Sequence, residues 1–137
     1  MKLLRAAAPR LLAAAPLLFL LAAGGCQEAY SAGKNLQVRN ETDVFQFQIS
    51  DMKNYSHTFT YRWINSGSLG AIVNQSSTIS GGDATLVLKD ALGTTVYSRS
   101  LKQNGRFTST DGASGEWTVQ ILANKVTGSV LLRADRN

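Results

Sequence analysis

Few residues in this chain could do acid, base or nucleophilic chemistry. Among 137 residues there are one histidine, one cysteine and nine acids. His57 could form a Ser-His-Asp triad with Asp51 or Asp83 and one of many serines. The Gly-x-Ser-x-Gly turn that often carries such a serine is missing, because Ser66 stands where the first glycine before Ser68 belongs. We therefore interpret His57, which begins a predicted strand, as an exposed histidine, and we expect no catalytic residue.

Metal chemistry has equally little support. One cysteine and one histidine exclude an intrachain disulfide and a Cys/His zinc cluster. Asp83, Asp90 and Asp111 fall in predicted turns, where an aspartate bonds to its own backbone. A calcium site needs about six to eight oxygen ligands, and no Asp-rich calcium loop is present. We expect neither a metal nor another cofactor.

Aromatic side chains could bind a sugar by stacking. Phe59, Tyr61 and Trp63 recur at every second position, which is typical of one buried strand face. Tyr55 and Tyr97 lie among polar residues instead. We expect these two to be exposed and take them as candidate ligand-binding residues.

The N-terminus has the features of a secretory signal. Its first ten residues carry basic side chains, and residues 11–23 form an unbroken apolar run. Thirteen residues are too few for a transmembrane helix, which needs about 20. The small residues Ala23, Gly24 and Gly25 follow, as at a signal cleavage site.

The end of this segment, Leu-Ala-Ala-Gly-Gly-Cys at 21–26, resembles the lipobox of bacterial lipoproteins. The resemblance implies that residues 1–25 are a removed signal peptide and that Cys26 is lipidated and anchors the chain to a membrane. It also implies a bacterial cell envelope location. Gln27 does not resemble the Asp that retains such proteins in the inner membrane, so the outer membrane is favoured in a Gram-negative cell. The alternative is an ordinary signal peptide cut near Gly25.

The remainder of the chain is nearly balanced in charge. The formal net charge is +5, but three of the fourteen basic residues lie before Cys26, where there is no acid. No basic cluster stands out in the rest, so we expect no nucleic-acid partner. We interpret residues 26–35 as the lipidated cysteine with a short tether, and residues 36–137 as one folded domain.

The domain shows a period of two and no helical pattern. The clearest alternation covers 45–49, 59–63 and 117–121, and less regular strands are predicted at 70–80, 84–89, 94–101, 106–109 and 129–134. Gly81-Gly82-Asp83, the segment 90–93 and Asn104-Gly105 are predicted to be turns between strands. The prediction is an all-β, antiparallel, jelly-roll-like β-sandwich of about eight strands after the N-terminal signal segment.

The stretch 84–134 resembles small secreted β-sandwiches, notably bacterial pre-peptidase C-terminal domains and the luminal GOLD domain. The shared features are an Asp-x-x-Gly hairpin at 90–93 and a later Gly-x-Trp-Thr-Val strand at 115–119. These families are mostly non-catalytic accessory modules, so the resemblance implies a fold and a non-enzymatic role. It assigns no site residue.

We therefore expect a lipid-anchored envelope β-sandwich that acts as a non-catalytic protein-binding or accessory module. Its partners would be a membrane, reached through Cys26, and an envelope protein. The first alternative is a lipoprotein that binds a glycan or polysaccharide, through Tyr55 or Tyr97. The second alternative is a small secreted hydrolase that uses His57 or a carboxylate pair. A structural spacer without a discrete ligand is a further alternative.

Overall fold

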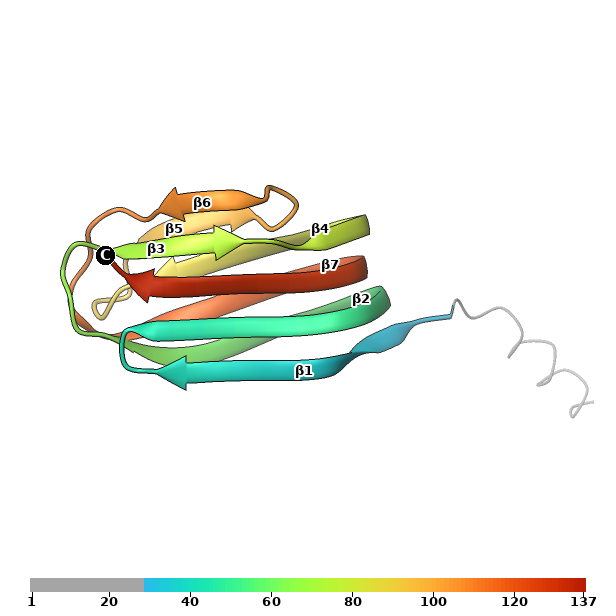
Figure 1. Ribbon diagram of the computed structural model, residues 1–137, viewed down its shortest axis with the longest axis horizontal. Helices are drawn as coiled ribbons and strands as arrows, with labels where there is room; N and C mark the ends of the chain where they lie inside the picture. Colours follow the sequence, from blue (N-terminus) through green and yellow to red (C-terminus); the bar gives the residue numbers. More distant parts are fainter. Residues whose placement is uncertain (1–28) are drawn as a thin grey trace, which may run out of the picture.

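The computed structural model describes residues 29–137, which form an all-β domain of seven antiparallel strands (Figure 1). The predicted signal segment 1–25 and Cys26 lie outside the described residues. The strands are β1 (Ser31–Glu41), β2 (Val44–Asn65), β3 (Ala71–Gln75), β4 (Thr78–Lys89), β5 (Thr95–Ser100), β6 (Gly105–Thr108) and β7 (Gly115–Arg136). The predicted all-β antiparallel fold is confirmed.

One sheet folds over on itself into two layers, because β2 and β7 are each 22 residues long and run through both. The layer at the front of Figure 1 has the order β1, β2, β7, β3, β6. In the layer behind it, the later half of β2 pairs with the earlier half of β7, β7 pairs with β4, and β4 pairs with β5. We call them the five-stranded layer and the four-stranded layer.

The long strands bend where their pairing register shifts, across residues 49–57 of β2. Asp51, Asn54 and Lys125 take positive φ at these bends. β4 bends beside them, and a Cβ on its Gly82 would overlap the carbonyl oxygen of Lys125. Only glycine allows this close approach of two backbones.

The core fills the space between the layers. Trp63 of β2 and Trp117 of β7 are fully buried and pack edge to face, with ring centroids 5.7 Å apart. Phe59 and Tyr61, also predicted to be core residues, are only partly buried and lie at its margin. All the buried apolar residues of the core cluster lie between residues 45 and 134. Residues 29–137 therefore contain a continuous core of their own, on which the domain can fold.

Several predicted boundaries are wrong for one reason, which is that strands continue through bends. The predicted strands 45–49 and 59–63 both belong to β2, and 117–121 and 129–134 both belong to β7. Gly81-Gly82-Asp83 lies inside β4, at its register shift, and not between two strands.

Two further predictions differ from the structure. Asn104-Gly105, whose type is typical of a tight hairpin turn, does not join paired strands, because β5 and β6 belong to different layers and β6 pairs with β3. The predicted tether 26–35 overlaps β1, which begins at Ser31 and pairs there with Lys53. Within residues 29–137 no helix has the length and apolar character needed to cross a membrane.

Candidate functional site

The two predicted ligand-binding tyrosines have different environments. Tyr97 is buried, and its hydroxyl donates a hydrogen bond to Oε1 of Gln75 at 2.6 Å. Burial raises the pKa of Tyr97, against a smaller opposing effect of Arg99. The prediction that Tyr97 is exposed is wrong, because Val96 and Tyr97 both point into the core beside the register shift of β4 and β5. Tyr55 is half-buried, and its ring stacks on that of Tyr30 with centroids 6.5 Å apart.

The residues considered for catalysis or metal binding are not brought together. His57 is exposed and its ring packs between Tyr55 and Phe59, at 5.9 and 4.7 Å between centroids. Asp83 forms an ion pair with Lys102. In the described part of the chain, no group of three His, Cys, Asp or Glu residues could hold a metal ion.

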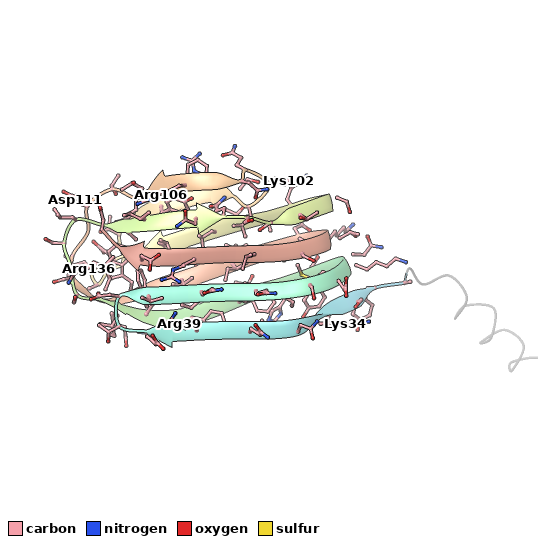
Figure 2. All side chains as sticks on the ribbon, in the orientation of Figure 1. Lys34, Arg39, Lys102, Arg106, Asp111 and Arg136 are labelled. Carbon is pink, nitrogen blue, oxygen red and sulfur yellow. The ribbon has the colours of Figure 1, made fainter. Side chains whose placement is uncertain are left out.

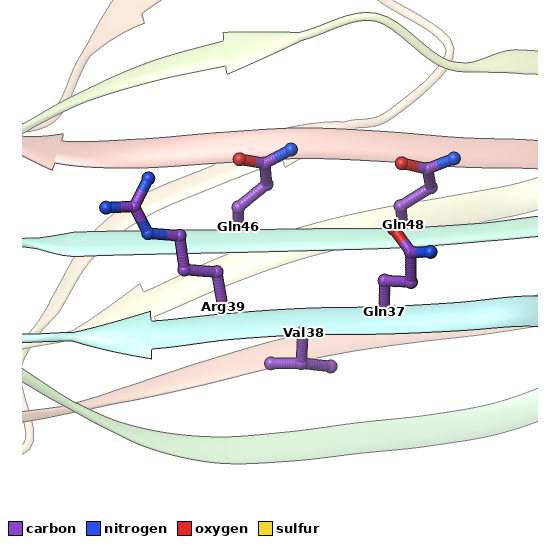
Figure 3. Close-up of a pocket in the computed structure, with 5 residues that line it drawn as sticks. All are labelled: Gln37, Val38, Arg39, Gln46 and Gln48. Carbon is purple, nitrogen blue, oxygen red and sulfur yellow. The ribbon is translucent and has the colours of Figure 1, made fainter.

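The structure instead brings polar side chains together on the outer face of the five-stranded layer. Gln37 and Arg39 of β1 lie directly opposite Gln48 and Gln46 of β2. Figure 3 shows these four side chains pointing the same way, while Val38 points to the other side of the sheet. They line a shallow groove of about 310 Å³.

This row of polar residues continues across the layer. Gln46 lies opposite Arg133 of β7, Arg133 lies opposite Asn74 of β3, and Asn74 lies opposite Arg106 of β6. Directly opposed residues share a face of the sheet. We call these residues the polar face: Gln37, Arg39, Gln46, Gln48, Asn74, Arg106 and Arg133.

The amides of the polar face are not used by the fold. The side chains of Gln37, Gln46, Gln48 and Asn74 make no hydrogen bond to any described residue. By contrast, amides elsewhere serve the fold: Gln75 donates to two backbone carbonyls, and Asn65 donates to Gly70 O at 3.1 Å. Each free amide offers both a donor and an acceptor.

Two of the three guanidinium groups on this face are neutralised by neighbouring acids, and Arg106 forms no ion pair with a described residue. Arg39 pairs with Glu41 at 2.8 Å and Arg133 pairs with Asp135 at 2.9 Å. The hydrogen bond from Arg39, followed by its charge, lowers the pKa of Glu41, and Asp135 raises the pKa of Arg133 in the same way. The face therefore suits a polar ligand with little charge better than a highly charged polymer.

A second surface lies along the edge of the sandwich, where β1 runs beside the later half of β2. The two strands are joined near one end by Asn40, whose Nδ2 donates to Arg62 O at 2.7 Å. Between the ends, Leu36 and Val38 are 50% and 38% exposed. We call Leu36, Val38 and the neighbouring Tyr55, His57, Phe59 and Tyr61 the β1 seam.

The alternation in β2 is a sequence signal for the polar face. Gln46 and Gln48 alternate with buried Phe45 and Phe47, so they had to lie on the water-facing side. That Gln37 and Arg39 lie beside them depends on the register of β1 with β2. Comparison with known proteins adds no assignment: no family model matches this chain, and neither a curated protein nor a solved structure matches it significantly.

Proposed function

We propose that this protein is a non-catalytic binding module of the bacterial cell envelope, anchored by lipidation of Cys26, and that its polar face binds a glycan. The anchor is inferred from the lipobox-like sequence before Cys26. The ligand is inferred from the polar face alone.

The observation that carries the ligand class is the set of free amides on one outer face of the sheet. Sugar hydroxyls donate and accept hydrogen bonds, and a primary amide does both. Interfaces between proteins usually have an apolar centre with aromatic anchors. The groove between β1 and β2 is lined by Gln37, Val38, Arg39, Gln46 and Gln48, so it offers hydrogen bonds and no aromatic anchor.

The test is binding to soluble peptidoglycan fragments and to outer-membrane polysaccharide, measured by isothermal titration calorimetry. We expect the double substitution Gln46→Ala and Gln48→Ala to weaken binding on the order of 30-fold, since each lost hydrogen bond is worth about 1 kcal/mol. Gln120→Ala is the matched control, because Gln120 is a half-exposed amide on the outer face of the four-stranded layer. The proposal would be refuted if Gln120→Ala weakened binding as much as the double substitution, or if the wild-type protein bound neither glycan.

The second candidate function is binding of a protein partner at the β1 seam, favoured by the exposure of Leu36 and Val38. An extended segment of a partner could pair with the free edge of β1 and cover these side chains. A photoreactive amino acid at Val38 should then give one discrete adduct in intact cells. The same group at Leu122, which is 40% exposed on the outer face of the four-stranded layer, should give none. A diffuse set of adducts from both positions would argue against this candidate.

A further inference from the structure

Three of the five lysines in the described residues lie at one end of the domain. β1 begins there, at the right of Figure 1, and β2, β4 and β7 bend there. Lys34 follows the start of β1, Lys53 pairs with Ser31, and Lys125 lies at the bend of β7. All three side chains are exposed, and none has an ion pair with another described residue. We call Lys34, Lys53, Lys125 and the adjacent Tyr30 the lysine end.

The fold holds these lysines in place through its bends. Lys125 itself has φ of 51°, and its backbone N–H donates to the hydroxyl of Ser56 at 2.9 Å. The N–H of Asn54, next to Lys53, donates to Thr127 Oγ1 at 3.2 Å. The β2 and β7 bends are thus bonded to each other, so Lys53 and Lys125 project from one corner.

Tyr30 adds an aromatic ring to the same end. It is 70% exposed and stacks on Tyr55 with an interplanar angle of 6°. Tyrosine rings are enriched at the interface between lipid and water, where an apolar ring meets a polar hydroxyl. Lysines attract anionic lipid headgroups, and an exposed tyrosine beside them suits the same interface.

Acids are gathered toward the other end of the strands. They cap turns there or lie near the strand ends, and they are Glu41, Asp43, Asp90, Asp111, Glu116 and Asp135. Figure 2 shows Asp111 and Arg136 at that end and Lys34 near the other. Near the lysine end the described acids are Asp51 and Asp83, and Asp83 is paired with Lys102.

We propose that the lysine end docks on an anionic lipid bilayer, which would make it the second membrane signal beside the lipid on Cys26. The inference rests on the proposed function in one respect, the anchoring at Cys26. From Cys26 to Tyr30 there are four residue steps, which span at most about 14 Å. An anchored chain therefore keeps the lysine end within reach of the headgroups, with the opposite end of the strands turned away.

The experiment uses Cys26 as the attachment point, since it is the only cysteine. The chain 26–137 is made without its signal, and the thiol is coupled to a maleimide carrying one 14-carbon chain. A single chain of this length gives weak, reversible binding, with an association constant of about 10⁴ M⁻¹. Partition is then measured on phosphatidylcholine vesicles with and without phosphatidylglycerol.

We expect the anionic vesicles to bind the coupled protein on the order of 100-fold more tightly, because each of three lysines near the surface contributes a factor of about five. The variant Lys34→Gln, Lys53→Gln, Lys125→Gln should lose most of this preference. The control variant Arg62→Gln, Lys89→Gln, Arg136→Gln removes the same charge near the other end and should keep it. Thermal melts check that both variants fold.

Two outcomes would overturn the inference: equal binding of the wild-type protein to both vesicles, or equal loss of preference in the lysine and control variants. The wild-type protein alone also gives a test, because its preference must vanish at about 1 M salt, where the Debye length is about 3 Å. Chemical coupling makes these results independent of whether cells lipidate Cys26. A failure here is therefore distinguishable from a failure of the proposed anchoring or of glycan binding.

Discussion

Asp90 shows how one side chain joins two loops of this domain. Its Oδ1 accepts hydrogen bonds from the backbone N–H groups of Leu92 and Thr94 in the β4–β5 hairpin, at 3.0 and 2.9 Å. Its Oδ2 accepts the N–H of Ala113, in the loop before β7, at 2.9 Å. The carbonyl oxygen of Ala113 in turn accepts a hydrogen bond from Nε1 of Trp117 at 2.8 Å. The carboxylate thus links a surface hairpin to the core tryptophan.

The charge of Asp90 should make stability depend on acid pH. The hydrogen bond from Ala113 is the largest influence and lowers the pKa of Asp90, with burial opposing it and the hairpin N–H groups adding to it. A lowered folded-state pKa gives stability that is full above the unfolded pKa of about 3.9 and is lost as pH falls through the folded value. Thermal melts should therefore show a lower Tm for Asp90→Ala at pH 7, and a smaller difference near pH 2. Asp111→Ala, at an exposed turn residue, is the control and should melt like the wild type. A constant Asp90→Ala difference from pH 7 to pH 2 would contradict this account.

Residue environments could be predicted where the alternation is clean. Trp63 and Trp117 are buried as their spacing predicts. Tyr97 could not be placed in this way, because polar neighbours in sequence do not show that Gln75 lies across the core as a hydrogen-bond partner. The partial burial of Tyr55 was hidden for the same reason, because its stacking partner Tyr30 lies 25 positions earlier in the sequence.

At the scale of elements, the bends of β2, β4 and β7 decide the architecture. The sequence predicted strands on both sides of each bend but not their continuity, because the bends contain many polar residues and glycines, which also suit turns. The register of β1 on β2, which assembles the polar face, was likewise not visible in the sequence.

Two neighbouring glycines at the β4 bend should respond differently to alanine. Gly82→Ala places a methyl group against the backbone of Lys125 at a φ of +72°, so we expect a loss of about 3 kcal/mol or more in unfolding free energy. Gly81→Ala places its methyl group 3.5 Å from Thr127 Cβ, an ordinary contact, so we expect a change of under about 1 kcal/mol. Urea unfolding measures both. Similar losses for the two variants would show that the close approach at Gly82 is unimportant.

At the scale of the whole molecule, β2 and β7 make the two layers one cooperative unit. Each strand contributes to both layers, so neither layer can lose its pairing without disturbing the other. Trp63 and Trp117 both lie in the four-stranded part of these strands, whereas far-ultraviolet circular dichroism reports on both layers. We expect the two signals to give the same urea midpoint. Separate midpoints would show that the layers unfold independently.

The orientation of the polar face follows from the direction of its strands. The row from Arg39 to Arg106 runs across the strands, whereas the lysine end lies at one end of them. A domain that stands on its lysine end would hold this row parallel to the bilayer. Lys34 pairs with Ser50 and Arg39 with Gln46, so at about 3.4 Å per residue the four positions along β2 place the row about 14 Å further out. The domain would then hold a bound glycan chain at a fixed distance from the membrane.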